Sequence, residues 1–248
     1  MAVVLETVDL SRSFGGVLAV DAVNVALAEG VVVGIIGANG AGKTTFVNLI
    51  TGYLKPDRGR ITHRGRDITA HPPREITRLG IARSFQIPQI YTSLTVLENV
   101  LVALAAREAR SLRPWAPLST PTREADALAV LEPFGLAAHA RRPVPELPEG
   151  GLKFLDIALS IALRPAVLLL DEPTSGVSSK DKFHVMETLL GIMRDRRVTV
   201  VFIEHDMEVV TRYAERLLAF VDGKVVADGL PQEVLANPDV RKAVLGVD

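Results

Sequence analysis

The sequence predicts an α/β fold built on a parallel β-sheet. Short apolar runs alternate with helical patterns after residue 166, which favours parallel strands joined by crossover helices. A wholly apolar run at 31–36 leads into a glycine-rich loop, as a buried parallel strand does. The chain has 248 residues, of which 48% are hydrophobic, so it can enclose a large core. Strands are expected at 167–170, 198–203 and 217–221, and helices at 180–194 and from Met207.

The remaining elements divide the chain into regions. Residues 1–87 contain the strand-like segments 3–10, 22–27, 31–36 and 59–63. Residues 88–165 are rich in alanine and leucine, with helical spacing at 95–109 and 122–134. A hairpin is expected at 219–228 with its turn at Asp222-Gly223, followed by two small helices. The pattern therefore predicts a strand-containing core from 1–87 and 166–248, with 88–165 as a helical region.

Composition limits the possible functions. The net charge of −1 gives no electrostatic case for binding nucleic acid. The absence of cysteine excludes disulfides and a cysteine nucleophile, and is typical of a reducing compartment. The N-terminus lacks the layout of a signal peptide, and Arg164-Pro165 interrupts the longest apolar stretch. Any role at a membrane is therefore expected to depend on a partner.

The most specific motif is the glycine-rich loop at residues 37–45. It fits the phosphate-binding pattern G-x-x-x-x-G-K-[ST], in which backbone N–H groups surround phosphate oxygens. Glycines allow the tight turn, the lysine reaches the β- and γ-phosphates, and the first threonine can bind Mg²⁺. The helix that follows directs its positive end toward the anion. The predicted phosphate-binding residues are Gly37, Asn39, Gly40, Ala41, Gly42, Lys43, Thr44 and Thr45.

A second motif, Val167-Leu-Leu-Leu-Asp171-Glu172-Pro173, places two carboxylates at the end of an apolar strand. In parallel sheets this end is where nucleotide phosphates bind. Asp171 is suited to holding Mg²⁺, and Glu172 to deprotonating an attacking water. Together with the phosphate loop, the pair predicts hydrolysis of a nucleoside triphosphate.

Three further residues complete a recognisable set: Phe14 in Ser13-Phe14-Gly15-Gly16, Gln86 after Ala82-Arg-Ser-Phe, and His205 in Phe202-Ile-Glu-His-Asp206. With these motifs the whole chain resembles the ATP-binding subunit of an ABC transporter. The resemblance implies a P-loop NTPase of the ABC fold: one domain over 1–248, with a RecA-like core, an N-terminal antiparallel β subdomain and an α-helical signature subdomain. It implies that Phe14 stacks on adenine, Gln86 touches Mg²⁺ and the water, and His205 contacts the γ-phosphate. Taken singly, Phe14 could instead be a core residue, Gln86 a surface amide and His205 a cap at a strand end.

Other segments narrow the resemblance to branched-chain amino-acid importers. They are 80–86, Leu94-Thr-Val-Leu-Glu-Asn-Val100, 203–207 and Gly229-Leu-Pro-Gln-Glu-Val-Leu-Ala-Asn-Pro238, together with a proline-containing insert at 110–121 that holds the single tryptophan, Trp115. Alternatives of the same plan are urea or amide importers and a lipopolysaccharide-exporting ATPase. A different class is a soluble ABC ATPase acting on nucleic acid or ribosomes, although the long insertions or second ATPase half usual in that class are not seen. A regulator without turnover is disfavoured by the presence of Asp171, Glu172 and His205.

The resemblance implies ATP and Mg²⁺ as cofactors and several partner chains. These are two integral-membrane permease subunits, a second ATPase subunit in a homo- or heterodimer that sandwiches ATP, and, indirectly, an extracytoplasmic substrate-binding protein. It implies no nucleic acid, and a peripheral location on the cytoplasmic face of the inner membrane. The surface near 86–104 is expected to receive short helices of the permease, with Trp115 either extending that contact or packing in a solvent loop.

One motif departs from the family pattern. The family signature, Leu-Ser-x-Gly-Gln, begins a helix that binds the γ-phosphate held by the opposite subunit, and its equivalent here is Leu147, Pro148, Glu149, Gly150 and Gly151. Pro148 lacks both the serine hydroxyl and an N–H donor. The basic residues that usually follow are reduced to Lys153, and Ser178 replaces a customary aspartate or asparagine.

Two interpretations of this departure remain open. In one, the variant motif still functions through Gly150 and the helix N-terminus. In the other, the dimer is asymmetric: this chain's phosphate loop and a partner's intact signature form the productive site, and the site completed by 147–151 hydrolyses ATP poorly.

Overall fold

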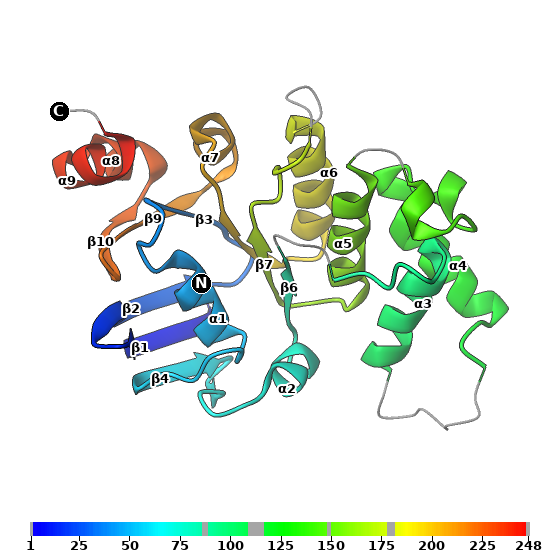
Figure 1. Ribbon diagram of the computed structural model, residues 1–248, viewed down its shortest axis with the longest axis horizontal. Coiled ribbons are helices and arrows are strands. Elements are labelled where there is room, and N and C mark those ends of the chain that lie inside the picture. The colour runs from blue at the N-terminus through cyan, green and yellow to red at the C-terminus, as the bar shows by residue number, and fades with distance from the viewer. Residues whose placement is uncertain (1, 86–88, 109–116, 148–149, 178–181, 247–248) are drawn as a thin grey trace.

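The computed structural model describes residues 2–85, 89–108, 117–147, 150–177 and 182–246. Its larger sheet has six strands in the order β10-β9-β3-β8-β7-β6 (Figure 1). Five of them run parallel, whereas β10 pairs antiparallel with β9. The strands are β3 (Val32–Gly37), β6 (Ile81–Ser84), β7 (Val167–Asp171), β8 (Thr199–Ile203), β9 (Arg216–Val221) and β10 (Lys224–Gly229). The predicted parallel sheet and the hairpin at Asp222-Gly223 are confirmed.

The smaller sheet is antiparallel and has the order β2-β1-β4-β5. Its strands are β1 (Val3–Phe14), β2 (Val17–Ala28), β4 (Arg58–His63) and β5 (Arg66–Asp67). Strands β1 and β2 are longer than the apolar patterns indicate, because register shifts between Thr7 and Ser13 interrupt the alternation of buried and exposed residues. The two sheets are those that the predicted ABC fold requires.

Helices cover both sheets and extend away from them (Figure 1). The longer helices are α1 (Lys43–Ile50), α3 (Val96–Arg107), α4 (Pro121–Leu131), α5 (Gly151–Ala162) and α6 (Lys182–Asp195). The shorter ones are α2 (Pro73–Arg78), α7 (Met207–Tyr213), α8 (Pro231–Ala236) and α9 (Pro238–Val240). None of the helices in the described ranges has the length and apolar composition needed to cross a lipid bilayer.

Two helices differ from the expectation. The segment expected as one helix over 122–134 is α-helical only to Leu131 and continues as a 3₁₀ turn over Glu132–Phe134. Pro133 lies in that turn and has no N–H to continue the α-helical bonding. Helix α2 was not predicted, because its six residues are too few to show a 3.6-residue period.

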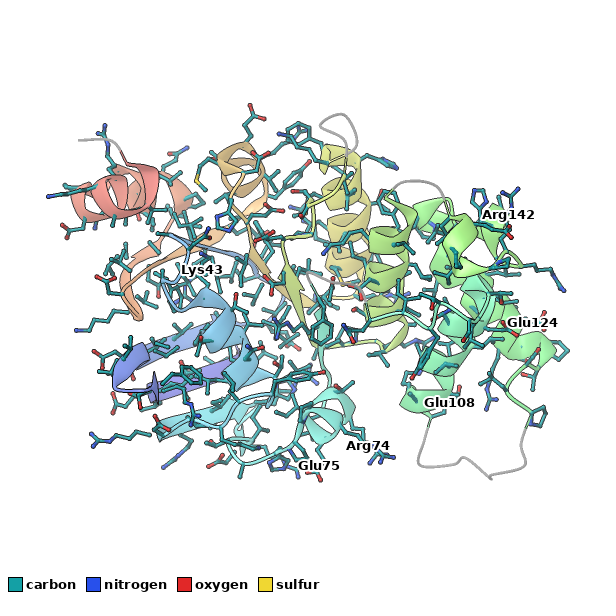
Figure 2. The ribbon with its side chains drawn as sticks, in the orientation of Figure 1. Lys43, Arg74, Glu75, Glu108, Glu124 and Arg142 are labelled. Atoms are coloured by element: carbon teal, nitrogen blue, oxygen red, sulfur yellow. The ribbon has the colours of Figure 1, made fainter. Side chains whose placement is uncertain are left out.

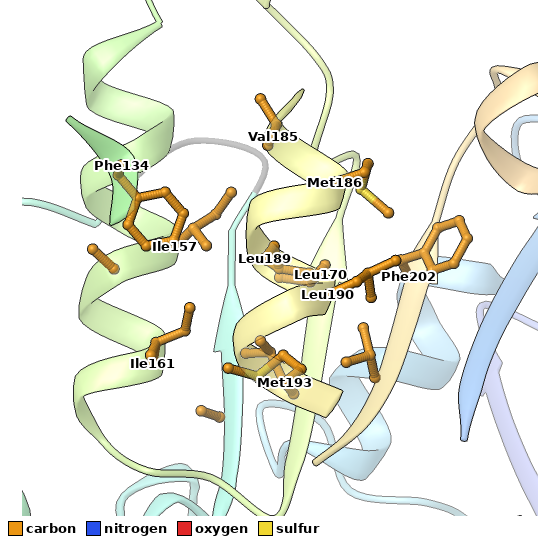
Figure 3. Packing of buried hydrophobic residues seen from close by; sticks show 14 of the residues in the cluster. Phe134, Ile157, Ile161, Leu170, Val185, Met186, Leu189, Leu190, Met193 and Phe202 are labelled. Carbon is orange, nitrogen blue, oxygen red and sulfur yellow. The ribbon is translucent and has the colours of Figure 1, made fainter. Parts of the chain in front are cut away.

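The six-stranded sheet separates two hydrophobic clusters. Along β7, Leu168 and Leu170 face the cluster beneath α3, α4, α5 and α6, whereas Leu169 faces the cluster shared with α1 and the smaller sheet. Figure 3 shows the first cluster, where Ile157 and Ile161 of α5 and residues of α6 converge on Leu170. Because both faces are covered, β7 is apolar at every position before Asp171. Its first polar side chain therefore emerges at the carboxyl end of the sheet.

Candidate active site

The phosphate loop and the acidic strand end meet in one cleft. Its volume is about 260 Å³, and its lining consists of Asn39, Gly40, Ala41, Gly42, Lys43, Thr44, Thr45, Asp171, Glu172, Ile203 and His205. Strand β3 enters the loop, and α1 begins at Lys43 directly after it. Since β3, β8 and β7 are parallel neighbours, their carboxyl ends bring all of these residues to one edge. Thus the structure assembles a site from three separate parts of the sequence.

Lys43 is buried at the start of α1, between the two sheets (Figure 2). Its Nζ donates hydrogen bonds to the carbonyl oxygens of Gly37, at 2.6 Å, and Ala38, at 2.9 Å. Burial lowers the pKa of Lys43, while the carboxylates of Glu172 and Asp171 act in the opposite direction. The ammonium therefore lies inside the loop that it is predicted to serve, close to the two acidic residues.

Gly42 is the position in the loop where a side chain fits worst, so we expect Gly42→Ala to abolish measurable ATP binding. Its φ is +97°, and an added Cβ would lie 2.1 Å from the carbonyl oxygen of Ala19 in strand β2. Gly40→Ala is the matched control, because Gly40 has a φ of +84° but no atom within 4 Å of an added Cβ. ATP affinity by titration calorimetry should fall much less for the control. Equal affinity losses would show that backbone strain, and not the clash with β2, is responsible.

Asp171 forms a buried ion pair that the sequence did not reveal. Its Oδ2 lies 2.8 Å from the guanidinium of Arg83, on the neighbouring strand β6. The same guanidinium donates to the Oδ1 atom of Asn48 in α1. Arg83 thereby joins the acidic strand end to the helix of the phosphate loop, and orients the carboxylate that is predicted to hold Mg²⁺.

Glu172 directs its carboxylate toward His205, with 3.3 Å between Oε1 and the histidine Nε2. Its backbone has a φ of +48°, a left-handed conformation that is uncommon for residues other than glycine, and its N–H donates to Ile203. Such strained backbone is concentrated at functional sites. The loops after β7 and β8 thus bring the two predicted catalytic residues into contact.

Glu204 forms hydrogen bonds with the segments that carry Glu172 and His205. It is buried, and its Oε1 accepts hydrogen bonds from the N–H and hydroxyl of Thr174, while its Oε2 accepts from the N–H of His205. Glu204 therefore ties the loop after Glu172 to the residue His205. Sequence reasoning missed this role, although a carboxylate directly after an apolar strand was a signal available in the sequence.

Phe14 lies outside the cleft lining but near the loop. It is 44% exposed at the end of β1, where the guanidinium of Arg12 lies 4.9 Å from its ring centroid. Phe14 pairs with Val17 of β2, and β2 passes next to the phosphate loop at Ala19. Phe14 is therefore an exposed aromatic side chain at the end of the strand that pairs with β2.

The described residues of the variant signature, Leu147, Gly150 and Gly151, belong to the helical region of the chain. Leu147 packs against the helical cluster, and Gly150, with a φ of +80°, precedes the first residue of α5, Gly151. None of these three residues lines the cleft. The other predicted site residues, Gln86, Pro148 and Glu149, lie outside the described part of the chain, as do Ser178 and Trp115.

Comparisons with known proteins agree with this geometry. The ABC transporter family model matches residues 20–175. The branched-chain amino acid transport ATP-binding protein LivG of Salmonella typhimurium is 38% identical, over 96% of this chain and 95% of its own length. The crystal structure of an ATP-binding cassette of an ABC transporter in its ADP conformation superposes with a TM-score of 0.87 at 31% identity, covering 99% of this chain and 100% of that one. A dimeric cassette bound to ADP and phosphate gives a TM-score of 0.79 at 26% identity, covering 92% and 98%.

The residues at the cleft are consistent with the family that the comparisons indicate. A phosphate loop, an acidic strand end and a histidine converge at the carboxyl edge of the parallel strands. The likeness extends over essentially the full length of the relatives and of the solved cassettes. The chain therefore belongs to the ABC transporter family, as one of its ATP-binding, ATP-hydrolysing cassettes.

Proposed function

We propose that this chain uses ATP hydrolysis to power the import of branched-chain or other hydrophobic amino acids. The observation that carries the catalytic part is the convergence of Lys43, Asp171, Glu172 and His205 at one cleft. The observation that supports the substrate class is the full-length likeness to a subunit named for branched-chain amino acid transport. The transported molecule itself would bind to partner chains, because the cleft of this chain has the chemistry of a phosphate site.

The proposed reaction is attack of water on the γ-phosphorus of ATP, in which the bond to the ADP oxygen breaks. Glu172 accepts the proton of the attacking water, and the contact with His205 holds its carboxylate in place. Lys43 and the loop N–H groups stabilise the charge on the phosphates. Positioning and charge stabilisation contribute most of the rate enhancement in reactions of this type.

The residues at the cleft also fit Mg²⁺. Among the described residues no three His, Cys, Asp or Glu side chains cluster as a metal cage. Mg²⁺ in phosphate sites does not need one, because it binds one or two protein oxygens together with water and phosphate. The Thr44 hydroxyl and the Asp171 carboxylate provide hard oxygen donors of this kind. When bound, the ion would neutralise charge on the β- and γ-phosphates.

A second ATPase subunit would complete the site. We propose that adenine stacks on Phe14 and that the signature motif of the opposite subunit covers the γ-phosphate. In return this chain offers 147–151, whose described residues lie outside its own cleft. The two interpretations of that motif, a functional variant or an asymmetric dimer, predict different effects of disabling each subunit.

The proposed location is peripheral, on the cytoplasmic face of the membrane, against two permease subunits. Two exposed aromatic side chains support a docking surface near 86–104: Tyr91 is 60% exposed, and Tyr53 is 54% exposed with its ring 5.6 Å from that of Phe85. Exposed aromatic groups are enriched at protein interfaces. An extracytoplasmic binding protein would deliver the amino acid to the permease.

Isolation of the complete complex tests the proposal. We expect this chain, carrying an affinity tag, to copurify with membrane permease subunits, a second ATPase subunit and a binding protein that binds leucine, isoleucine or valine. Transport of labelled leucine into proteoliposomes should require ATP. Urea or amide binding, lipopolysaccharide transfer, or copurification of ribosomes or nucleic acid would each contradict the proposed substrate class.

A further inference from the structure

Helix α5 carries a stripe of three buried polar side chains on an otherwise apolar face. Lys153, Asp156 and Ser160 are 6%, 4% and 4% exposed, and their i, i+3, i+7 spacing places them on one side of the helix. The neighbouring buried residues of α5, such as Ile157 and Ile161, are aliphatic. Burial of a charged group is unfavourable unless specific partners compensate for the lost hydration. The partners of this stripe therefore indicate what it is for.

The stripe forms hydrogen bonds with backbone groups at the free edge of the six-stranded sheet. Within the described ranges strand β6 is the last strand of that sheet, so one side of its backbone has no neighbouring strand there. The Ser160 hydroxyl donates to the carbonyl oxygen of Arg83, at 3.2 Å. Asp156 accepts from the N–H of Phe85, and Lys153 donates to the carbonyl oxygen of Phe85, at 3.1 and 3.2 Å. Helix α5 thus takes the place of a missing strand.

The two charged residues of the stripe also form hydrogen bonds with groups other than the edge of β6. Asp156 also accepts from the Ser84 hydroxyl, at 2.5 Å, and from the N–H of Gln89, at 3.4 Å. It therefore holds the backbone on both sides of the segment 86–88. Lys153 also donates to the backbone carbonyl oxygen of Asp171, at 3.1 Å. Ser160, in contrast, forms no hydrogen bond to either of these regions within the described part of the chain, and its second bond goes to the carbonyl oxygen of Asp156 in the same helix.

We infer that Asp156 and Lys153 are positioning residues for ATP hydrolysis, a role that rests on the proposed functions of Gln86 and Asp171. Asp156 sets where the chain leaves β6 before Gln86 and where it returns at Gln89. Lys153 sets the backbone of Asp171, directly before the proposed base Glu172. Both belong to the first turns of α5, which begins at Gly151 of the signature motif. Helix α5 therefore connects Gly151 of the signature to the backbone next to the proposed water-activating residues.

The variant Asp156→Asn tests this role within the complete transporter complex. Asparagine has the same size but only one acceptor oxygen, so one of the two flanking N–H groups loses its partner. We expect kcat for ATP hydrolysis to fall about tenfold or more, because sub-ångström misplacement of reacting groups has effects of this order. The KM for ATP should stay within about twofold, since the substitution does not touch the phosphate loop.

Ser160→Ala is the matched control on the same helix stripe. It removes a hydrogen bond to the same edge strand but leaves Phe85, Gln89 and Asp171 untouched. We expect its melting temperature to fall while kcat stays within about twofold of the unmodified complex. If kcat follows the melting temperature across both variants, the stripe only stabilises the fold and the inference is wrong.

Two further variants keep the test decisive. If Asp156→Asn fails to assemble, Lys153→Gln is measured in its place. The glutamine amide can reach one carbonyl oxygen where Lys153 binds two. We expect this variant also to lower kcat without a matching change in the KM for ATP. Glu172→Gln is measured in parallel. Full hydrolysis by Glu172→Gln would contradict the proposed catalytic role, whereas an inactive Glu172→Gln together with unchanged kcat in Asp156→Asn or Lys153→Gln would contradict only the positioning role.

Discussion

Glu172→Gln is expected to lower kcat for ATP hydrolysis by about 100-fold or more, while ATP still binds. The amide keeps the size of the side chain but cannot accept a proton from water. The carboxylate that is replaced lies 3.3 Å from His205 Nε2 through its Oε1 atom. Phosphate release by the purified complex measures the rate, and titration calorimetry measures ATP affinity. Retention of a normal rate would remove Glu172 from the mechanism.

The same substitution also decides between the two interpretations of the signature 147–151. In an asymmetric dimer, Glu172→Gln in this chain abolishes transport, whereas the equivalent change in the partner ATPase leaves much of it. In a dimer with two productive sites, both changes reduce transport equally. Leucine uptake by vesicles carrying each singly changed complex separates the outcomes, with the doubly changed complex as the background control.

Lys43→Ala is the second substitution with a large expected effect: ATP affinity should fall by about 100-fold or more. The ammonium is buried and already held by the carbonyl oxygens of Gly37 and Ala38, so its charge is fixed at the loop before phosphate arrives. Charge-assisted bonds to phosphate in such a desolvated site are among the stronger polar interactions. Fluorescent nucleotide titration of the purified complex gives the change in affinity.

Lys55→Ala serves as the control for Lys43→Ala. The Nζ of Lys55 also donates to a backbone carbonyl oxygen, that of His71, but it lies at an exposed position outside the cleft. Its loss should leave ATP affinity within about twofold. If both lysine variants weaken binding alike, the effect reflects a general change in charge rather than the phosphate loop.

Local patterns were sufficient for the elements around the phosphate loop. The apolar run before Gly37 predicted β3, because a strand buried on both faces is apolar throughout. The loop itself predicted the start of α1, because a phosphate loop requires glycine at fixed positions. Thr95 and Glu98 form the capping box that starts α3 one residue later than the periodicity suggests. Boundaries failed where bulges or Pro133 broke the period.

The charged groups around the site were harder to predict. The side chains of Arg83, Asp156 and Glu204 are buried and hydrogen-bonded to residues from distant segments, for example across 88 positions between Arg83 and Asp171. Their sequence neighbours are unremarkable. For Asp156 and Glu204, a charged residue within an apolar helix or directly after an apolar strand was the available signal, and it identifies burial of charge without identifying the partner.

The sequence by itself determined the chemistry of this protein: a phosphate loop, two carboxylates after an apolar strand, and a histidine after the next strand. Those features depend on residue type and local spacing, which a single chain displays directly. Only the tertiary structure decided how the chemistry is held in place. The parallel order of β3, β8 and β7 brings Glu172 to His205, and the edge position of β6 lets Lys153 and Asp156 of α5 bind its backbone. These contacts join segments far apart in sequence, so packing alone selects them.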